Sequence, residues 1–152
     1  MPRVKRITAG DTAFLEQITA MEQRCFSDPW SLQSFIDAAN NACTTVWAAT
    51  DGETVLGYLV CFCAADEAEI CNIAADPEHR REGIGAMLLQ TALAAHPEAD
   101  FYLEVRVSNT AARALYEKHG FRELGIRPDY YENPRENAII MKREAPAGRS
   151  HA

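Results

Sequence analysis

A turn rich in arginine and glycine, residues 80–85, has the composition of a phosphate-binding loop. It reads Arg-Arg-Glu-Gly-Ile-Gly and joins a strand-like apolar run at residues 68–75 to a helix-like run at residues 83–95. At a helix N-terminus the first backbone N–H groups have no intrahelical acceptor, and the helix dipole adds positive charge there. Glycines let a ligand approach the backbone, and arginines add charge. The turn therefore predicts a site for a nucleotide-like cofactor that carries a pyrophosphate.

The glycine spacing distinguishes between known kinds of phosphate loop. A P-loop requires Gly-Lys-Ser/Thr, whereas this chain has Gly83-Ile84-Gly85-Ala86. A dinucleotide-binding fingerprint requires a third glycine or alanine where Leu88 stands. Both interpretations are weakened, and a tight turn that binds no ligand stays open as the structural alternative.

A charged pair lies inside the strand-like run at residues 101–107. Glu104 and Arg106 fall on one face of that strand, and its apolar residues fall on the other. A carboxylate on a strand is more often a solvated edge residue. Here the run lies between two helix-like runs, which predicts a central strand and makes a bare surface charge less favourable. Glu104 is therefore a candidate for acid or base chemistry.

The elements that position these residues alternate along the chain. Strands are predicted by β-branched and aromatic runs at residues 4–7, 44–49, 54–63, 68–75, 101–107, 121–124 and 137–142. Helices are predicted from an Asp11 N-cap to about Cys25, after a Ser31 cap, over residues 83–95, and over residues 109–119 with Gly120 at the C′ position. Asp51-Gly52 predicts a hairpin, and residues 126–136 predict a polar loop.

These elements predict a single α/β domain over residues 1–143, followed by a disordered tail at residues 144–152. The formal charge of −7 argues against nucleic-acid binding and favours a cationic partner. The five cysteines are odd in number and fall mostly in apolar runs, which indicates a reducing compartment. No apolar run reaches the ~18 residues of a membrane span, and no cysteine or histidine set has metal-site spacing. We expect a soluble cytoplasmic protein with no membrane contact and no metal.

Two motifs in order carry a family resemblance. The first is Arg80-x-x-Gly83-x-Gly85, and the second is Asn109-x-x-Ala112-x-x-x-Tyr116-x-x-x-Gly120-Phe121. Together they resemble the GNAT family of acetyl-CoA-dependent N-acetyltransferases, over nearly the whole chain to Met141. The resemblance implies a GNAT fold, with a mixed, mostly antiparallel sheet of six or seven strands that splays in its middle and is flanked by about four helices.

The resemblance also implies where acetyl-CoA binds. Backbone groups of one strand would hold the pantetheine arm and polarise the acetyl carbonyl, and we assign them to Ile73, Ala74 and Ala75. The turn that follows would wrap the pyrophosphate, with the side chain of Glu82 pointing away from it. That turn comprises Arg81, Glu82, Gly83, Ile84, Gly85 and Ala86. Asn109, from the second motif, is counted with the cofactor-binding residues.

Acetylation of an amine requires a base, because only the neutral amine attacks and an α-amine has a pKa near ~8. Glu104, acting directly or through a water, is the candidate general base. An aromatic residue at the position of Tyr116 is usually core. The family pattern instead implies that Tyr116 lies near the CoA sulfur and acts as the general acid.

Within the family the chain resembles the RimI group, which acetylates protein N-termini. The resemblance implies a peptide groove whose walls carry Phe26 and Trp30 on one loop and Tyr130 and Tyr131 on another. The implied partner is the N-terminal peptide of a small-subunit ribosomal protein that begins with alanine. Three alternatives stay open. The acceptor could be a lysine or a small-molecule amine, the chain could be a non-catalytic module that binds CoA or a protein, and the tyrosine loop could simply shield a sheet edge.

Overall fold

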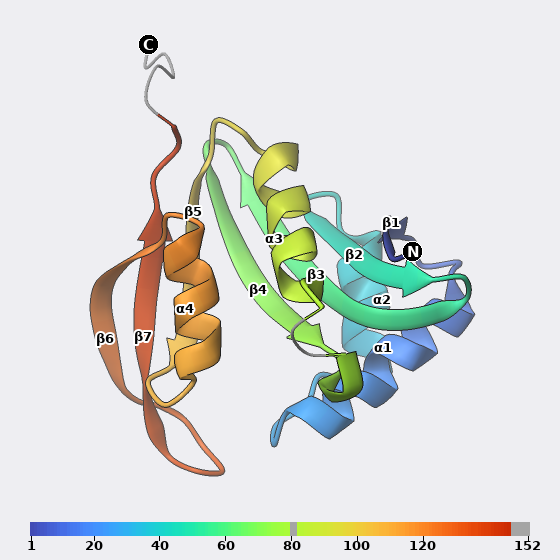
Figure 1. The fold of residues 1–152 in the computed structure, drawn as a ribbon, viewed down its shortest axis with the longest axis horizontal. Helices are drawn as coiled ribbons and strands as arrows, with labels where there is room; N and C mark the ends of the chain where they lie inside the picture. The colour runs from blue at the N-terminus through green and yellow to red at the C-terminus, as the bar shows by residue number, and fades with distance from the viewer. Residues whose placement is uncertain (80–81, 147–152) are drawn as a thin grey trace.

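Seven strands form one twisted sheet in the order β1-β2-β3-β4-β5-β7-β6 (Figure 1). The computed structural model describes residues 1–79 and 82–146. The strands are β1 (Arg3–Ile7), β2 (Thr44–Asp51), β3 (Thr54–Ala64), β4 (Glu67–Ala75), β5 (Asp100–Arg106), β6 (Arg122–Tyr131) and β7 (Glu136–Arg143). The helices are α1 (Thr12–Cys25), α2 (Leu32–Asn40), α3 (Ile84–Ala95) and α4 (Thr110–Lys118), with a short 3₁₀ turn η1 (Pro77–His79).

The sheet divides where β4 meets β5. All other neighbouring strands pair antiparallel, whereas β4 and β5 run parallel. Their register holds only from Glu67 opposite Asp100 to Glu69 opposite Tyr102. Beyond that point the two strands diverge, as the ribbon shows (Figure 1). We call the region between residues 70–75 of β4 and the rest of β5 the β4–β5 opening. The predicted mixed sheet that splays in its middle is confirmed.

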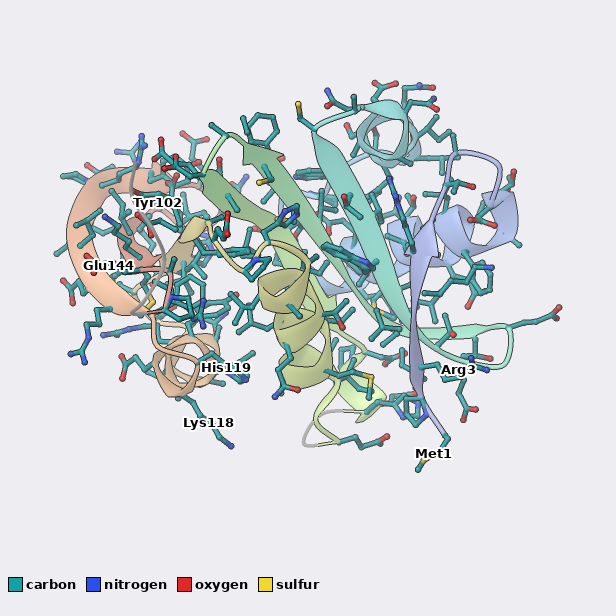
Figure 2. All side chains as sticks on the ribbon, turned by 90° about the horizontal axis from the view of Figure 1, so that it is seen from above. Met1, Arg3, Tyr102, Lys118, His119 and Glu144 are labelled. Carbon is teal, nitrogen blue, oxygen red and sulfur yellow. The ribbon has the colours of Figure 1, made fainter. Side chains whose placement is uncertain are left out.

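Helices cover both faces of the sheet, so the core has two layers (Figure 2). On one face the apolar residues of α1 and α2 pack on β1, β2 and β3 around the buried Tyr58. On the other face α3 and α4 pack around Leu88, Leu89 and Tyr116. Lys118 and His119, at the end of α4, mark this second layer in the view from above. The predicted arrangement, with four helices on two faces, is confirmed.

The helix ends follow the sequence signals closely. Ser31 Oγ accepts a hydrogen bond from the Ser34 N–H at 3.1 Å and caps α2. Gly120, with a φ of +92°, ends α4 in a left-handed conformation that glycine adopts without strain. Asp11 precedes α1 as predicted, but its carboxylate accepts from the N–H of Thr8 at 2.8 Å and does not cap the helix. The sequence thus located both ends of α1 and α4 and the start of α2.

One prediction of the sequence is wrong, because most of the predicted loop at residues 126–136 is strand. β6 continues to Tyr131, and the connection to β7 is a short turn. β6 is the edge of the sheet, where proline is tolerated because one side of the strand needs no donor. Pro128 therefore does not end the strand. Asp129, with a φ of +50°, lies where the register with β7 shifts, so the strand bends and continues.

The last described residues lie beside the parallel pair of strands. The N–H of Ala145 donates to Asp100 Oδ1 at 2.9 Å, and residues 147–152 of the predicted tail lie outside the described residues. Among the described residues, no helix combines the length and the apolar character that a membrane span requires.

Candidate active site

The free edge of β4 exposes backbone groups in the β4–β5 opening. The N–H of Asp76 donates to the carbonyl of Leu56 on β3 at 2.8 Å, and the same register places Ala74 opposite Tyr58. Amides of an antiparallel strand point alternately to its two edges. The N–H of Ala74 therefore points toward β3, and those of Ile73 and Ala75 point toward the opening, where β5 offers no registered partner.

The N-terminus of α3 lies just beyond β4 and has backbone donors with no acceptor inside the helix. The first intrahelical bond runs from the N–H of Met87 to the carbonyl of Gly83 at 3.0 Å, so the N–H groups of residues 84–86 have no intrahelical acceptor. Gly83 occupies the N-cap position with a φ of +77°, and no side chain caps the helix. The predicted contact of Arg81 lies outside the described residues. The fit to a pyrophosphate therefore rests on Gly83, Ile84, Gly85 and Ala86.

Glu82 does not place its negative charge at the start of α3. Its carboxylate lies 3.0 Å from His79 Nδ1, on the short turn η1. The side chain is thus directed back toward η1, which leaves the start of α3 without this negative charge.

Gly57 on β3 sets how closely α3 approaches the sheet, and the sequence analysis missed it. A Cβ at this position would lie 2.6 Å from Ile84 Cγ2 and 2.8 Å from the Ala74 carbonyl oxygen. The absence of a side chain therefore lets the first turn of α3 rest on β3 beside the β4–β5 opening. A glycine inside a strand pattern is a signal for such close approach, and it could have identified the position.

Glu104 borders the opening from β5. Its neighbours Leu103 and Val105 are buried beneath α3 and α4, so alternation places its carboxylate on the opposite face of the sheet. Arg127 Nε lies 3.2 Å from Glu104 Oε2. That oxygen is buried and accepts no hydrogen bond from the described residues. Its contact is therefore the ion pair with Arg127, and Glu104 itself lies two residues beyond Tyr102, the last residue of β5 in register with β4.

The two tyrosines of β6 surround this carboxylate. Burial, followed by the charge of Glu104, raises the pKa of Tyr131 to about 12. The same two causes raise the pKa of Tyr130, whose ring packs edge-on against that of Tyr131 at 5.0 Å between centroids. The structure therefore brings Glu104, Tyr130 and Tyr131 together.

Tyr116 approaches the same region from the opposite face. Its ring is buried in α4 and lies 5.8 Å from that of Phe121. Burial, followed by the nearby Tyr131, raises the pKa of Tyr116. The predicted acid therefore remains protonated at neutral pH. Tyr131 is thus close enough to act electrostatically with both the predicted base, Glu104, and the predicted acid, Tyr116.

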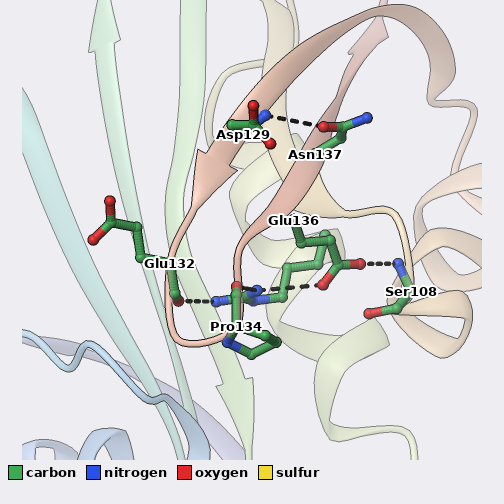
Figure 3. Close-up of polar contacts among 7 residues, drawn as sticks. Ser108, Asp129, Glu132, Pro134, Glu136 and Asn137 are labelled. Atoms are coloured by element: carbon green, nitrogen blue, oxygen red, sulfur yellow. Dashed lines mark hydrogen bonds and ion pairs between the residues drawn. The ribbon is translucent and has the colours of Figure 1, made fainter.

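Arg106 fixes the hairpin between β6 and β7 that carries Tyr131 (Figure 3). Its guanidinium donates to the carbonyls of Glu132 and Pro134, each at 2.8 Å, and lies 4.5 Å from the centroid of the Tyr131 ring. Glu136 Oε2 is 3.3 Å from the guanidinium, and Glu136 Oε1 accepts from the N–H of Ser108 at 2.5 Å. A planar cation with several donors can hold two carbonyls and stack on a ring at once.

A buried carboxylate fixes the loop that carries Trp30. Glu22, 2% exposed, accepts hydrogen bonds from the Trp30 N–H at 3.0 Å, from Asn72 Nδ2 at 2.8 Å and from the Tyr58 hydroxyl. These bonds tie the loop between α1 and α2 to β3 and β4. Sequence analysis missed Glu22, although it follows Ile18 by four residues on the apolar face of α1, where an acidic residue is itself a signal.

The comparisons with known proteins agree with this geometry. The model of the acetyltransferase (GNAT) family matches residues 15–121. This chain belongs to the GNAT family. Among its relatives, the [ribosomal protein bS18]-alanine N-acetyltransferase of Escherichia coli (strain K12) is 36% identical over 140 residues, which cover 89% of this chain and 94% of the relative. The putative enzyme of the same name from Bacillus subtilis (strain 168) is 34% identical over 131 residues, covering 84% and 87%.

Solved structures show the same fold. The crystal structure of the ribosomal-protein-S18-alanine N-acetyltransferase from Escherichia coli superposes with a TM-score of 0.88 at 32% identity, covering 100% of this chain and 99% of that one. Ard1 from Thermoplasma volcanium superposes with a TM-score of 0.80 at 24% identity, covering 93% and 96%, which shows the fold alone. The protein is therefore a GNAT acetyltransferase, an enzyme that uses acetyl-CoA.

The remaining site residues of this GNAT acetyltransferase have the following places. Asn109 is the N-cap of α4, and its Oδ1 accepts from the Ala112 N–H at 3.2 Å. Its contact with the cofactor stays a prediction. Phe26 follows α1 and is 37% exposed. Among the described residues, no hydrogen bond or ring contact joins its side chain to Glu104 or Tyr131. In the same part of the chain, no group of three metal-ligating side chains is found.

Proposed function

We propose that this GNAT acetyltransferase transfers acetyl from acetyl-CoA directly to the N-terminal α-amine of ribosomal protein bS18, at an alanine. The substrate is taken from the names of the relatives, which match along most of their length. The observation that carries the chemistry is the buried Glu104 Oε2, which accepts no hydrogen bond from the described residues. This oxygen is held by an ion pair with Arg127, and an amine that enters the β4–β5 opening would donate a hydrogen bond to it.

Backbone groups hold the cosubstrate in this proposal. The N–H groups of Ile73 and Ala75 point into the β4–β5 opening, so they are suited to the pantetheine arm and the acetyl carbonyl. Ala74 directs its N–H toward β3, and we therefore assign polarisation of the carbonyl to Ile73. The N–H groups of residues 84–86, which have no acceptor inside the helix, would bind the pyrophosphate at the positive end of α3. We keep Arg81 and Glu82 in the proposed set of cofactor-binding residues.

Glu104 and Tyr116 would handle the two protons of the reaction. Acetyl-CoA supplies a thioester, which is activated toward amines. Glu104 accepts the proton that the amine loses as its nitrogen bonds to the acetyl carbon. Tyr116 donates a proton to the sulfur as the carbon–sulfur bond breaks. A tyrosine is protonated at neutral pH, and burial raises the pKa of Tyr116 further, so the donor is ready before the substrate binds.

The walls of the site favour a peptide as acceptor. The Trp30 loop is fixed through Glu22 and the Tyr131 hairpin through Arg106, so two aromatic walls are fixed on the acceptor side. Rigid walls lower the entropy that an extended peptide loses on binding. We also propose that residues 1–143 form the single working domain and that the enzyme acts in the cytoplasm, where free thiols such as its cysteines persist.

An acetylation assay on two peptides tests the function. One peptide begins with a free alanine and contains no lysine, and the other has a blocked N-terminus and one lysine. We expect acetyl-CoA to be consumed only with the first, with the added mass on its first residue by tandem mass spectrometry. Acetylation of the lysine alone would overturn the proposal.

Two variants test the base. Glu104→Gln should lower kcat by about a hundredfold near neutral pH and leave CoA binding intact. The matched control is Glu53→Gln, which removes the same charge from an exposed turn. A Glu104→Gln enzyme with full activity at pH 7 would refute the assignment.

A further inference from the structure

A groove of about 620 Å³ opens beside the acceptor side of the site. We call it the α2 groove, because α2 forms one wall and strands β2, β3 and β4 form its floor. Its lining residues are Trp30, Ser34, Asp37, Ala38, Thr44, Val60, Phe62, Glu69 and Cys71. The proposed function uses only Trp30 among them, so the rest of the groove has no role yet.

The α2 groove lies within reach of a bound peptide. Glu69 stands opposite Tyr102, and Glu104 lies two residues further along β5 on the same face. With about 3.3 Å per residue and about 4.8 Å between strands, the Cα atoms of Glu69 and Glu104 are roughly 8 Å apart. An extended chain spans that distance in two to three residues. Side chains near the acceptor's N-terminus can therefore enter the groove.

The charge of the α2 groove is negative. Glu69 and Asp37 contribute carboxylates, and no lysine or arginine is among the lining residues. Among the described residues Glu69 forms no ion pair, and Arg127, the cation that acts on it, is paired with Glu104 at 3.2 Å. Glu69 is exposed to the groove, yet desolvation and then the charge of Glu104 raise its pKa. Two carboxylates in one site favour a cationic ligand.

The walls of the α2 groove suit a long cationic side chain. Trp30 and Phe62 line it, and Phe62 is 39% exposed although it is a large apolar residue. Aromatic faces attract ammonium and guanidinium groups, and they also pack against methylene stems. Carboxylates beside aromatic rings therefore match lysine and arginine more closely than any neutral or acidic side chain.

We propose that the α2 groove binds a lysine or arginine side chain at the second or third position of the acceptor peptide. The inference rests on the proposed function, in which the amine of the first residue lies at Glu104. It adds a requirement that the function alone does not contain, namely a positive charge at a defined distance from the acetylated amine.

Four peptides that begin with alanine test the inference. Three carry a single arginine at position two, three or six, and the fourth has glutamine at each of these places. We expect kcat/KM to be about three- to tenfold higher for arginine at position two or three than for the glutamine peptide. Arginine at position six should gain less than about twofold, since only overall charge attracts it.

Two variants locate the effect. Glu69→Gln should reduce the preference for arginine to near one. Glu67→Gln, an exposed position two residues earlier on β4, removes the same formal charge outside the α2 groove and should keep the preference. Thermal unfolding of both variants checks that they fold.

Binding of the same peptides by calorimetry, with CoA present, measures the groove independently of turnover. A preference there supports the groove even if no alanine peptide is acetylated, which would defeat only the proposed function. Acetylation and binding without any preference would overturn the groove alone. Equal gains from arginine at positions two and six, or equal losses in both variants, would also overturn it, because they would show attraction by net charge.

Discussion

Replacement of Gly57 by alanine should disturb the proposed cofactor site, because the new methyl group on β3 would press against the start of α3. The new Cβ would lie 2.6 Å from Ile84 Cγ2, whereas ordinary contact begins near 3.4 Å, so the atoms must separate by about 0.8 Å. Ile84 is β-branched and stiff within a helix, and the other close atom, at 2.8 Å, is the backbone oxygen of Ala74. Neither side yields easily, so the first turn of α3 must move.

The expected magnitude follows from this crowding. Overpacking of this kind costs about 1–3 kcal/mol, which for a domain of this size lowers Tm by roughly 2–12 °C. Because the displaced turn carries the unpaired donors of residues 84–86, we expect the Kd for CoA to rise about tenfold, equivalent to about 1.4 kcal/mol.

Differential scanning calorimetry and titration with CoA measure the two effects of Gly57→Ala. The control is Gly125→Ala on β6, where a Cβ would meet no atom within 4 Å. It makes the same chemical change without crowding, so both quantities should stay close to those of the unaltered enzyme. If Gly57→Ala retained the Tm and CoA affinity of this control, the account of how β3 positions α3 would be refuted.

Three further predictions concern charged residues. Arg106→Lys keeps the positive charge but loses the planar guanidinium that holds the β6–β7 hairpin, so the KM for the peptide should rise about tenfold while the Kd for CoA stays the same. A variant in which only the Kd for CoA changes would contradict the role of Arg106 in fixing the hairpin. Glu22→Gln places an NH₂ group against the Trp30 N–H, so the free energy of unfolding measured in urea should fall by about 1–3 kcal/mol. Unchanged stability would refute the hydrogen bond between Glu22 and Trp30. Because the folded pKa of Glu69 is raised from 4.5, its carboxylate destabilises the fold above that folded pKa. Glu69→Gln should therefore have a higher Tm than the unaltered enzyme at pH 7, and the two Tm values should become equal below about pH 4.5. A difference in Tm that does not change with pH would contradict the raised pKa of Glu69.

Local signals in the sequence predicted most of the fold. Ser31, the Asp51-Gly52 turn and Gly120 mark ends that depend on a few neighbouring residues, and each lies where it was expected. The strand β6 did not follow its local signal, since Pro128 is tolerated only because this strand became the sheet edge. Edge position depends on strand order, which a single chain's local pattern does not contain.

The residues of the site also fall into two groups, those that the sequence indicated and those that it did not. Gly83 and Glu104 were recognised because their chemistry is visible in residue type and spacing. Gly57 and Glu22 act through partners more than twenty residues away in sequence, namely Ile84 on α3 and Asn72 on β4. Their roles become visible only when packing brings those partners together. The roles of Glu104 and Tyr116 in catalysis stay predictions, which the variants above test.

The end of the β4–β5 register at Glu69 gives this sheet an unpaired edge in its interior. Free edges normally lie at the outside of a sheet, where another polypeptide can add to them and start aggregation. Here β4 and β5 converge at their registered pairs, so the unpaired stretch of β4 lies inside the sheet and not at its outer edge. In the proposed function, the backbone hydrogen bonds of this stretch go to the cosubstrate.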